Sequence, residues 1–197
     1  MGSVYERVLG SRMSELDPRL RAYFGEIPPG SVGRGTGVYE VAGSRHRWLR
    51  PVFAVLASRR VLFPELGHDI PFTVENRGDR RATRTFAFPR RTREMRDEMT
   101  VVDGTLRDRL DVLEVELLLD VAAGSLRMHS RRQWVRLGRL RVRVPAIVTV
   151  TLTEQAEGDH QRVDVRMTAP VLGEVFRYAG TFDYAISSSG PWTAPRR

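Results

Sequence analysis

From residue 70 to residue 186 the chain alternates apolar and polar residues with a period of two, and turn-forming residues interrupt this alternation at intervals. Alternation of this kind predicts β-strands with one buried face. We expect strands at 70–77, 82–88, 94–102, 112–121, 126–135, 146–154, 162–168 and 174–186. The connections are short, for example Asp103-Gly104 and Gly158-Asp159. They therefore predict antiparallel neighbours, because a parallel pair needs a crossover of about a dozen residues or more.

Residues 1–66 predict a helical part that contains one strand. Apolar residues recur at helical spacing between residues 4 and 24, and Asp17-Pro18 supplies a helix cap and a first turn. We therefore expect two helices, at 4–13 and 18–24. The glycine-rich segment GRGTG at 33–37 precedes the β-prone stretch 38–41. We interpret it as a tight entry into a strand, because a dinucleotide-binding loop needs a different glycine spacing, a preceding strand and a following helix.

A basic amphipathic helix is predicted between residues 47 and 62. Its apolar stripe consists of Trp48, Leu49, Val52, Phe53, Val55 and Leu56, and arginines flank the stripe at positions 45, 47, 50, 59 and 60. Pro51 is compatible with a helix only in the first turn. We expect the stripe to pack on the sheet, although a basic amphipathic helix can also lie on a membrane surface.

These elements predict a single, mainly β domain over residues 1–186, helical with one strand at 1–66 and antiparallel β at 67–186. We expect a strongly curved sheet or a lipocalin-like β-barrel with the N-terminal helices packed on it. A helix-grip α+β fold is the alternative, although the predicted final strand and polar tail leave no room for the long C-terminal helix of that fold. Residues 136–145 are interpreted as a longer interruption, and 187–197 as a disordered tail of turn-forming composition.

The composition excludes several kinds of chemistry. The chain has no cysteine and no lysine, and all 32 of its basic residues are arginine. Disulfides and thiolate sites are therefore excluded, as are Schiff bases and lysine-dependent phosphate loops. The net charge of +8 favours an anionic partner, but interspersed acidic residues favour a solvated arginine-rich surface. No secretory leader is recognised and no apolar run approaches the ~20 residues of a membrane span, so we expect a cytoplasmic protein.

Four polar residues interrupt the apolar faces of four different predicted strands. Arg84 shares its face with two phenylalanines, and Asp97 lies between two methionines. Glu154 continues a face of valine and leucine, and Tyr178 lies among aromatic residues. Because alternate residues of a strand share a face, a polar residue on the apolar face is informative. If the sheet closes into a barrel, we expect these side chains to point inward and at least two of them to line one cavity.

A pocket with aromatic walls and a few convergent polar groups is the usual form of a small-molecule site. In such a pocket we assign catalytic roles to Glu154, Asp97 and Tyr178, with a carboxyl group of raised pKa as the acid–base and the phenol as a hydrogen-bond donor. The expected ligand-binding residues are Arg84, Phe86, Phe88, Met99 and Phe176, with the arginine on an anionic or carbonyl group. The alternative is a structural ion pair of Arg84 with Asp97 or Glu154 that only fixes strand register.

No other motif predicts a site. The histidines, His46, His68, His129 and His160, are scattered, and none has metal-ligand spacing with another. No GxSxG nucleophile motif is present, and the sequence implies neither a metal nor a cofactor. Arginines cluster at 77–93 and 131–143, but the aromatic residues that could stack on bases there are few: Phe86, Phe88 and Trp134. We therefore do not expect a nucleic-acid partner.

Several segments resemble, in the same order, a bacterial family known as domain of unknown function 4166. They are LDPRLRAYF at 16–24, GRGTG at 33–37, TRTFAFP at 83–89, LGRLRVRVP at 137–145, Glu154 and APVLGEVFRYAGTF at 169–182. The resemblance covers nearly the whole chain apart from the C-terminal tail. Members of that family occur alone or fused to reductase-like domains of the saccharopine-dehydrogenase type. The resemblance thus implies a small-molecule context and transfers no catalytic residue. Because this chain contains no reductase portion, a reductase partner would act in trans.

Two functional hypotheses follow. The first is a barrel pocket that binds a hydrophobic small molecule, with isomerase or cyclase activity in secondary metabolism as its catalytic form. The second is a non-catalytic accessory module that docks on a reductase partner, or on a membrane surface through the helix at 48–56. The first needs the inward polar residues to line a cavity, and the second needs that helix to expose its apolar side chains.

Overall fold

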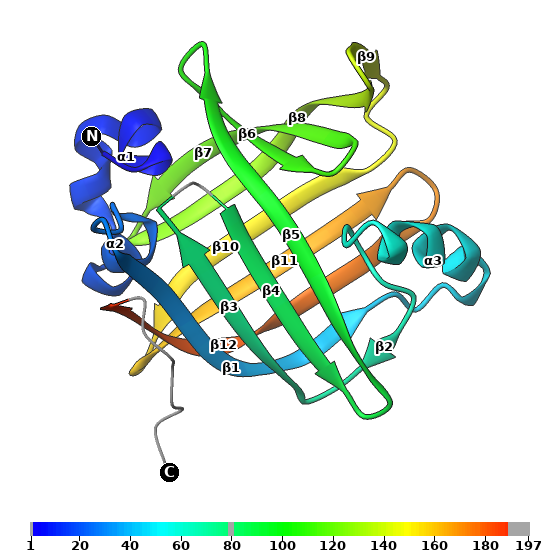
Figure 1. The fold of residues 1–197 in the computed structure, drawn as a ribbon, viewed down its shortest axis with the longest axis horizontal. Coiled ribbons are helices and arrows are strands. Elements are labelled where there is room, and N and C mark those ends of the chain that lie inside the picture. Colours follow the sequence, from blue (N-terminus) through cyan, green and yellow to red (C-terminus); the bar gives the residue numbers. More distant parts are fainter. Residues whose placement is uncertain (1, 79–80, 189–197) are drawn as a thin grey trace.

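An antiparallel sheet closed into a barrel forms the body of the protein (Figure 1). It is seen in a computed structural model that describes residues 2–78 and 81–188. The wall strands are β1 (Ser31–Gly43), β3 (Ile70–Arg77), β4 (Arg81–Phe88), β5 (Arg91–Val102), β6 (Thr105–Leu110), β7 (Leu113–Ala122), β8 (Ser125–Leu137), β10 (Thr149–Glu157), β11 (His160–Ala169) and β12 (Gly173–Ser188). Two short strands, β2 (Leu66–Gly67) and β9 (Leu140–Val144), pair with β1 and β8 outside this ring. The mainly β, barrel-forming class expected from the sequence is confirmed.

The strands follow one another around the wall almost in sequence order. β3 to β8 pair consecutively, β10 to β12 do the same, and β1 is inserted between β12 and β3. The ring closes where β10 pairs with β8, for example at Leu152 and Met128. The pairings among the described strands are antiparallel, as the short connections predict. The described chain ends in β12 rather than in a long helix, so the helix-grip alternative is wrong.

Short helical segments cover one end of the barrel (Figure 1). They are α1 (Val4–Leu9), a 3₁₀ segment (Gly10–Glu15) and α2 (Pro18–Phe24). The helix expected at 4–13 therefore ends early and continues as the 3₁₀ segment. Asp17 caps α2 with its side chain, as the Asp-Pro pair predicts. Tyr23 of α2 packs edge-on against Phe182 of β12, with 5.5 Å between the ring centroids, which fixes α2 to the barrel interior.

The GRGTG segment lies inside β1 and not at the entry of a strand, which corrects the prediction. Gly33, Gly35 and Gly37 alternate along β1 on the face that also carries the buried Tyr39. A Cβ at Gly37 would lie 2.0 Å from the Thr181 carbonyl oxygen of β12. A Cβ at Gly35 would lie 2.9 Å from the ring of Phe182, which also belongs to β12. The missing side chains therefore let β12 approach β1 closely.

The helix predicted at 47–62 is shorter in the structure. A 3₁₀ turn at Arg47–Leu49 leads into α3 (Arg50–Ser58), and Pro51 lies in the first turn, where its missing N–H breaks no hydrogen bond. His46 Nε2 lies 3.0 Å from the Glu174 carbonyl oxygen. This contact holds the segment before α3 against the beginning of β12.

Only part of the predicted apolar stripe is buried. Phe53 is 5% exposed and packs against Phe176 of β12, with 5.7 Å between the ring centroids. By contrast, Trp48, Val52 and Val55 are 61%, 55% and 61% exposed. The expectation that the whole stripe packs on the sheet is therefore wrong, because one side of α3 contacts the barrel and the other faces solvent.

Three strands of the structure, β2, β6 and β9, lie where the sequence predicts none. β6 falls between two predicted strands, and β8 continues through Arg136 and turns at Gly138 into β9. The interruption predicted at 136–145 is therefore wrong. β12 also runs to Ser188, two residues into the tail predicted at 187–197, and residues 189–197 lie outside the described ranges. Charged residues make up the middle of β6 and hide the apolar alternation of a strand. β9 does alternate apolar residues with arginine, but it is only five residues long and none of its side chains is buried.

Gly37→Ala should destabilise the barrel, because the new methyl group would overlap the Thr181 carbonyl oxygen. We expect the free energy of unfolding to fall by about 2–3 kcal/mol, as in overpacked interiors. Gly78→Ala is the matched control, since the nearest atom to its Cβ would be the Ile27 carbonyl oxygen at 3.5 Å. Urea denaturation compares the two variants with the wild type, and equal midpoints for all three would contradict this explanation of GRGTG.

Phe53→Ala should also destabilise the protein, because it leaves a cavity where α3 packs on β12. Large-to-small changes of this kind in a core cost about 3–5 kcal/mol. Val55→Ala on the same helix should cost less than about 0.5 kcal/mol, since Val55 is largely exposed and surface substitutions have small effects. The free energies of unfolding of the two variants are the measurement. A melting temperature that hardly moves in Phe53→Ala would show that α3 is placed wrongly.

Candidate functional site

The barrel encloses a small cavity of about 70 Å³. Its wall carries charged and hydroxyl groups among many apolar side chains: Arg84, Asp97, Asp108, Glu154, Tyr5, Tyr23 and Tyr178. The apolar part of the wall includes four methionines, at positions 95, 99, 128 and 167. The structure thus brings together the four polar residues that interrupt the apolar strand faces in the sequence. Their roles in binding or catalysis stay predictions.

Arg84 and Asp97 form an ion pair between β4 and β5. The register places Ala82 opposite Asp97 and Arg84 opposite Met95, so the charged side chains are diagonal neighbours on the inward face. Arg84 Nη1 donates to Asp97 Oδ1, and the two side chains are only 14% and 3% exposed. Asp97 Oδ2 has no hydrogen-bond partner among the described residues. Burial raises the pKa of Asp97, and the positive charge of Arg84 opposes that rise.

A further carboxyl group, Asp108, faces the same cavity from β6, and the sequence analysis misses it. Its Oδ1 atom is buried and has no hydrogen-bond partner within the described part of the chain. Burial, and after it the charge of Asp97, raises the pKa of Asp108 well above its ordinary range. The sequence does contain a signal, because Asp108 alternates with Leu106 and Leu110. That signal is usable only once β6 is known to be a strand.

Glu154 extends from β10 and is 3% exposed. Its Oε2 atom accepts a hydrogen bond from the Gln161 side-chain amide of β11, and no arginine of the described ranges forms an ion pair with it. Burial raises the pKa of Glu154 to about 7, against the opposing effects of the Gln161 hydrogen bond and the charge of Arg84. Glu154 therefore gains and loses a proton near neutral pH, which is the range suited to a general acid or base.

Tyr178 projects inward from β12 and is 5% exposed. Burial raises the pKa of its phenol to about 12, so the hydroxyl keeps its proton at neutral pH and can act as a donor. Tyr178, Arg84 and Glu154 also line a second void of about 10 Å³. Groups from β4, β10 and β12 therefore converge on one small region of the interior.

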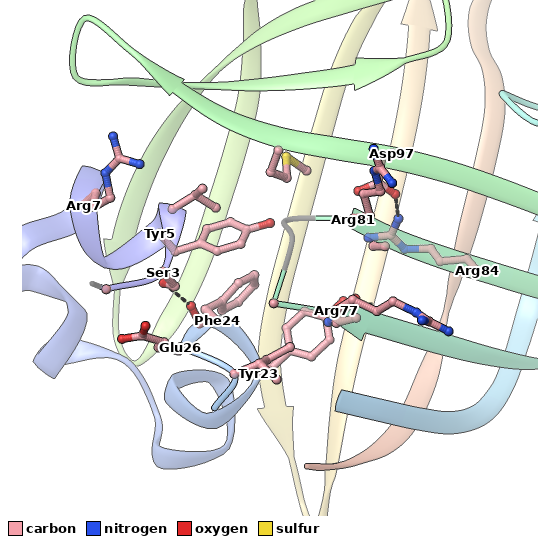
Figure 2. Close-up of a pocket in the computed structure, with 18 residues that line it drawn as sticks. Ser3, Tyr5, Arg7, Tyr23, Phe24, Glu26, Arg77, Arg81, Arg84 and Asp97 are labelled. Atoms are coloured by element: carbon pink, nitrogen blue, oxygen red, sulfur yellow. Dashed lines mark hydrogen bonds and ion pairs between the residues drawn. The ribbon is translucent and has the colours of Figure 1, made fainter. Parts of the chain in front are cut away.

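A larger cleft of about 380 Å³ adjoins the cavity at the end covered by α1 and α2. The residues that line both spaces are Tyr5, Tyr23, Arg84, Asp97 and Met99. Figure 2 shows Tyr5, Tyr23 and Phe24 on one side of the cleft, and Arg84 with Asp97 on the other. The N-terminal helices thus form one wall of the passage between the molecular surface and the buried charges.

The phenylalanines predicted to contact a ligand lie in another part of the interior. Phe86, Phe88 and Phe176 surround Phe63, with ring centroids 4.8, 5.2 and 5.0 Å from it. None of the three lines the 70 Å³ cavity or the cleft. They form an aromatic cluster beneath α3, because Phe176 also contacts Phe53 of that helix. Among the predicted ligand-binding residues, Arg84 and Met99 do line the cavity.

The arginine-rich outer face of the barrel covers Trp134. Trp134 is 8% exposed and lies under Arg107 and Arg141, whose guanidinium carbons are 5.0 and 3.9 Å from the ring centroid. Glu114 forms ion pairs with both arginines, at 3.2 and 2.6 Å. The tryptophan ring is therefore occupied by arginines of the same chain and is not presented as an open stacking surface.

Neither a cluster of metal-binding side chains nor a membrane-spanning helix is found among the described residues. Across residues 2–78 and 81–188, no group of three or more histidine, aspartate and glutamate side chains is close enough together to bind one. None of the helices in these ranges combines the length and the apolar character that crossing a membrane requires.

The stability of the protein should depend on pH through Glu154. In the folded state, Glu154 keeps its proton up to about pH 7. In an unfolded chain, Glu154 releases the proton near the ordinary value of 4.5. The stability associated with this proton is fully present below pH 4.5 and is lost as the pH rises through 7. Relative to Glu154→Gln, the wild type should therefore lose about 2–3 kcal/mol between roughly pH 5 and pH 8. Urea denaturation measures this difference, and a constant difference would contradict the raised pKa.

Comparison with known proteins places the chain in a family. The sequence model described as "Domain of unknown function (DUF4166)" matches residues 16–182. The "Uncharacterized protein YndH" of Bacillus subtilis (strain 168) is 27% identical to the chain over 204 residues, which covers 92% of this chain and 97% of that protein. No solved structure matches the chain. The resemblance inferred from the ordered sequence segments is confirmed, and the chain belongs to the DUF4166 family.

Proposed function

We propose that the barrel binds a hydrophobic small molecule, which places one polar group in the interior cavity and its apolar body in the adjoining cleft. The proposal is carried by two buried oxygens at the cavity wall, Asp97 Oδ2 and Asp108 Oδ1, which have no partner among the described residues. A buried acceptor without a partner costs about 1–3 kcal/mol. A ligand that supplies a hydrogen-bond donor, such as a hydroxyl group, removes this cost.

The volumes of the inner cavity and the cleft support a ligand with a small polar head. The inner cavity of about 70 Å³ suits a carbonyl or hydroxyl group with one or two carbon atoms. The cleft of about 380 Å³ falls within the usual range of small-molecule sites, roughly 300–1,000 Å³. Met99 lies at the junction, and methionine side chains adapt to ligands of irregular shape. The aromatic side chains of α1 and α2 would contact the apolar body of the ligand.

Proton transfer by Glu154 is the catalytic form of this proposal. The carboxylate would take a proton from a carbon beside the ligand's carbonyl group, and the resulting acid would return the proton to another carbon. This is an isomerisation that needs no oxidant or reductant. In a cyclisation, the same enolate carbon would add to a second carbonyl group of the ligand, and the oxygen of that carbonyl would take the proton from the Glu154 acid. Arg84 and Tyr178 supply N–H and O–H donors for the enolate oxygen. A pKa of about 7 keeps both forms of Glu154 populated at neutral pH.

A methyl ketone probe tests binding and proton transfer in one experiment. We expect 2-acetylnaphthalene to bind with its acetyl group in the cavity, as measured by its fluorescence. Tyr178→Phe should weaken binding by roughly three- to tenfold, the effect of one lost hydrogen bond. The matched control is Tyr184→Phe, because that residue lines neither the inner cavity nor the cleft. Equal affinities for both variants would contradict the placement of the polar group.

Exchange of the acetyl protons of the same probe with deuterium oxide reports on Glu154. The wild type should accelerate this exchange above the rate in buffer, and Glu154→Gln should lower the acceleration by about 100-fold or more. The variant's melting temperature checks that it is folded, and its affinity for the probe checks that the cavity is intact. A variant that binds the ketone and exchanges its protons as fast as the wild type would exclude Glu154 as the acid–base. Native mass spectrometry of the purified protein is the complementary search for a natural ligand.

A further inference from the structure

One side of α3 and of the 3₁₀ turn before it exposes apolar side chains that the barrel interior does not use. Trp48, Val52 and Val55 are 61%, 55% and 61% exposed. Their positions follow the spacing i, i+4 and i+7, so they share one face of the helical segment. The buried Phe53 lies on the opposite face. Single exposed apolar residues are ordinary on a protein surface, but a helix face composed of them needs an explanation.

Two neighbouring connections add to this apolar surface. Their exposed side chains are Ile147, in the β9–β10 connection, and Val171 and Leu172, in the β11–β12 connection, at 65%, 104% and 39%. The pairing of Thr149 with Thr168 shows that these connections leave the sheet side by side. The contact of His46 with the Glu174 carbonyl oxygen holds the α3 segment beside them. Figure 1 shows α3 and the β11–β12 connection at the end of the barrel away from α1 and α2. We call these six side chains the α3-end surface.

The charges in the helical part of the α3-end surface have one sign. Between residues 41 and 64 the sequence contains five arginines and no acidic residue. Arg59 and Arg60 pair with Asp111 and Glu94 at the far end of the helix. The other three, Arg45, Arg47 and Arg50, are exposed, and no ion pair or side-chain hydrogen bond to another described residue neutralises them. Unpaired cations therefore border the exposed tryptophan and valines.

We propose that the α3-end surface docks on an anionic lipid bilayer. Apolar side chains of an amphipathic helix insert into the headgroup and upper acyl region, and arginines beside them bind the lipid phosphates. Tryptophan prefers this interface, because its ring is largely apolar and its N–H finds a polar partner. Docking in this way directs α1, α2 and the cleft away from the lipid. This proposal does not depend on the proposed ligand or on Glu154.

Charge complementarity is the reason for choosing lipid as the occupant. A second copy of this chain would bring the same three arginines against each other at a symmetric contact, which is unfavourable. Phosphate headgroups supply negative charge along a continuous plane, and that plane matches apolar side chains contributed by a helix and two separate connections. Each arginine near such a surface contributes about 1 kcal/mol to binding.

Sedimentation with vesicles tests the proposal on the full chain. We expect binding to phosphatidylcholine vesicles that contain phosphatidylglycerol, and little binding to phosphatidylcholine alone. Arg45→Gln/Arg47→Gln/Arg50→Gln should lower the partition coefficient by roughly 100-fold, from the contribution per arginine. The charge-matched control is Arg19→Gln/Arg21→Gln/Arg127→Gln, exposed residues elsewhere on the surface, which should bind nearly as the wild type does.

A second pair of variants tests the apolar part. Trp48→Ser/Val52→Ser/Val55→Ser should lose binding at least tenfold, whereas Val38→Ser/Ile186→Ser, at other exposed apolar positions, should keep it. Circular dichroism and melting temperature confirm that each variant is folded. Equal binding to both kinds of vesicle, or a control that loses as much binding as its partner variant, would overturn the proposal. So would sedimentation equilibrium that shows a dimer abolished by the Trp48/Val52/Val55 variant, because the surface would then be an interface between two copies.

Discussion

The close approach of β12 to β1 is the constraint on which the rest of the interior depends. Gly35 and Gly37 have no side chain on the inward face of β1, and the backbone and aromatic side chains of β12 occupy that space. The wall can therefore close from β12 through β1 to β3, with Tyr23 of α2 packed on Phe182 at one end. A closed wall restricts the access of water to the interior, where charges are weakly solvated and their interactions are strong. The unusual proton affinity of Glu154 follows from this enclosure.

The interior contains more ionisable groups than a stable barrel requires. Arg84 neutralises Asp97, but Asp108 and Glu154 have no arginine of their own among the described residues. Replacing buried ionic groups with apolar ones is often neutral or stabilising, so their presence is not explained by stability. The two alternatives posed by the sequence, a structural ion pair and a polar pocket, are compatible here, because the Arg84–Asp97 pair forms part of the cavity wall. Buried carboxyl groups with raised pKa values favour a binding or catalytic role.

The strands could be predicted where inward residues are apolar and outward residues polar. In those strands the alternation also located Arg84, Asp97, Glu154 and Tyr178. It failed at β6, where Asp108 stands inward between Leu106 and Leu110 and arginines stand outward. A charged inward residue removes the very signal that identifies a strand, so the element and its site residue are missed together. The division of α3 into a buried and an exposed face could not be predicted either. Helical periodicity gives a stripe, and only the packing on Phe176 decides which part of it is covered.

An enclosed polar cavity requires Glu154 to be buried beside few charges of opposite sign, so the protonation of Glu154 is the most direct measurement of it. Carbon-detected NMR can follow the side-chain carboxyl signals of the glutamates through a pH titration, with Glu154→Gln to assign the resonance. We expect a midpoint of about 7 for Glu154, in a protein that stays folded throughout. A midpoint near the ordinary value of 4.5 would show that the carboxylate is solvated or paired, and would contradict an enclosed polar cavity.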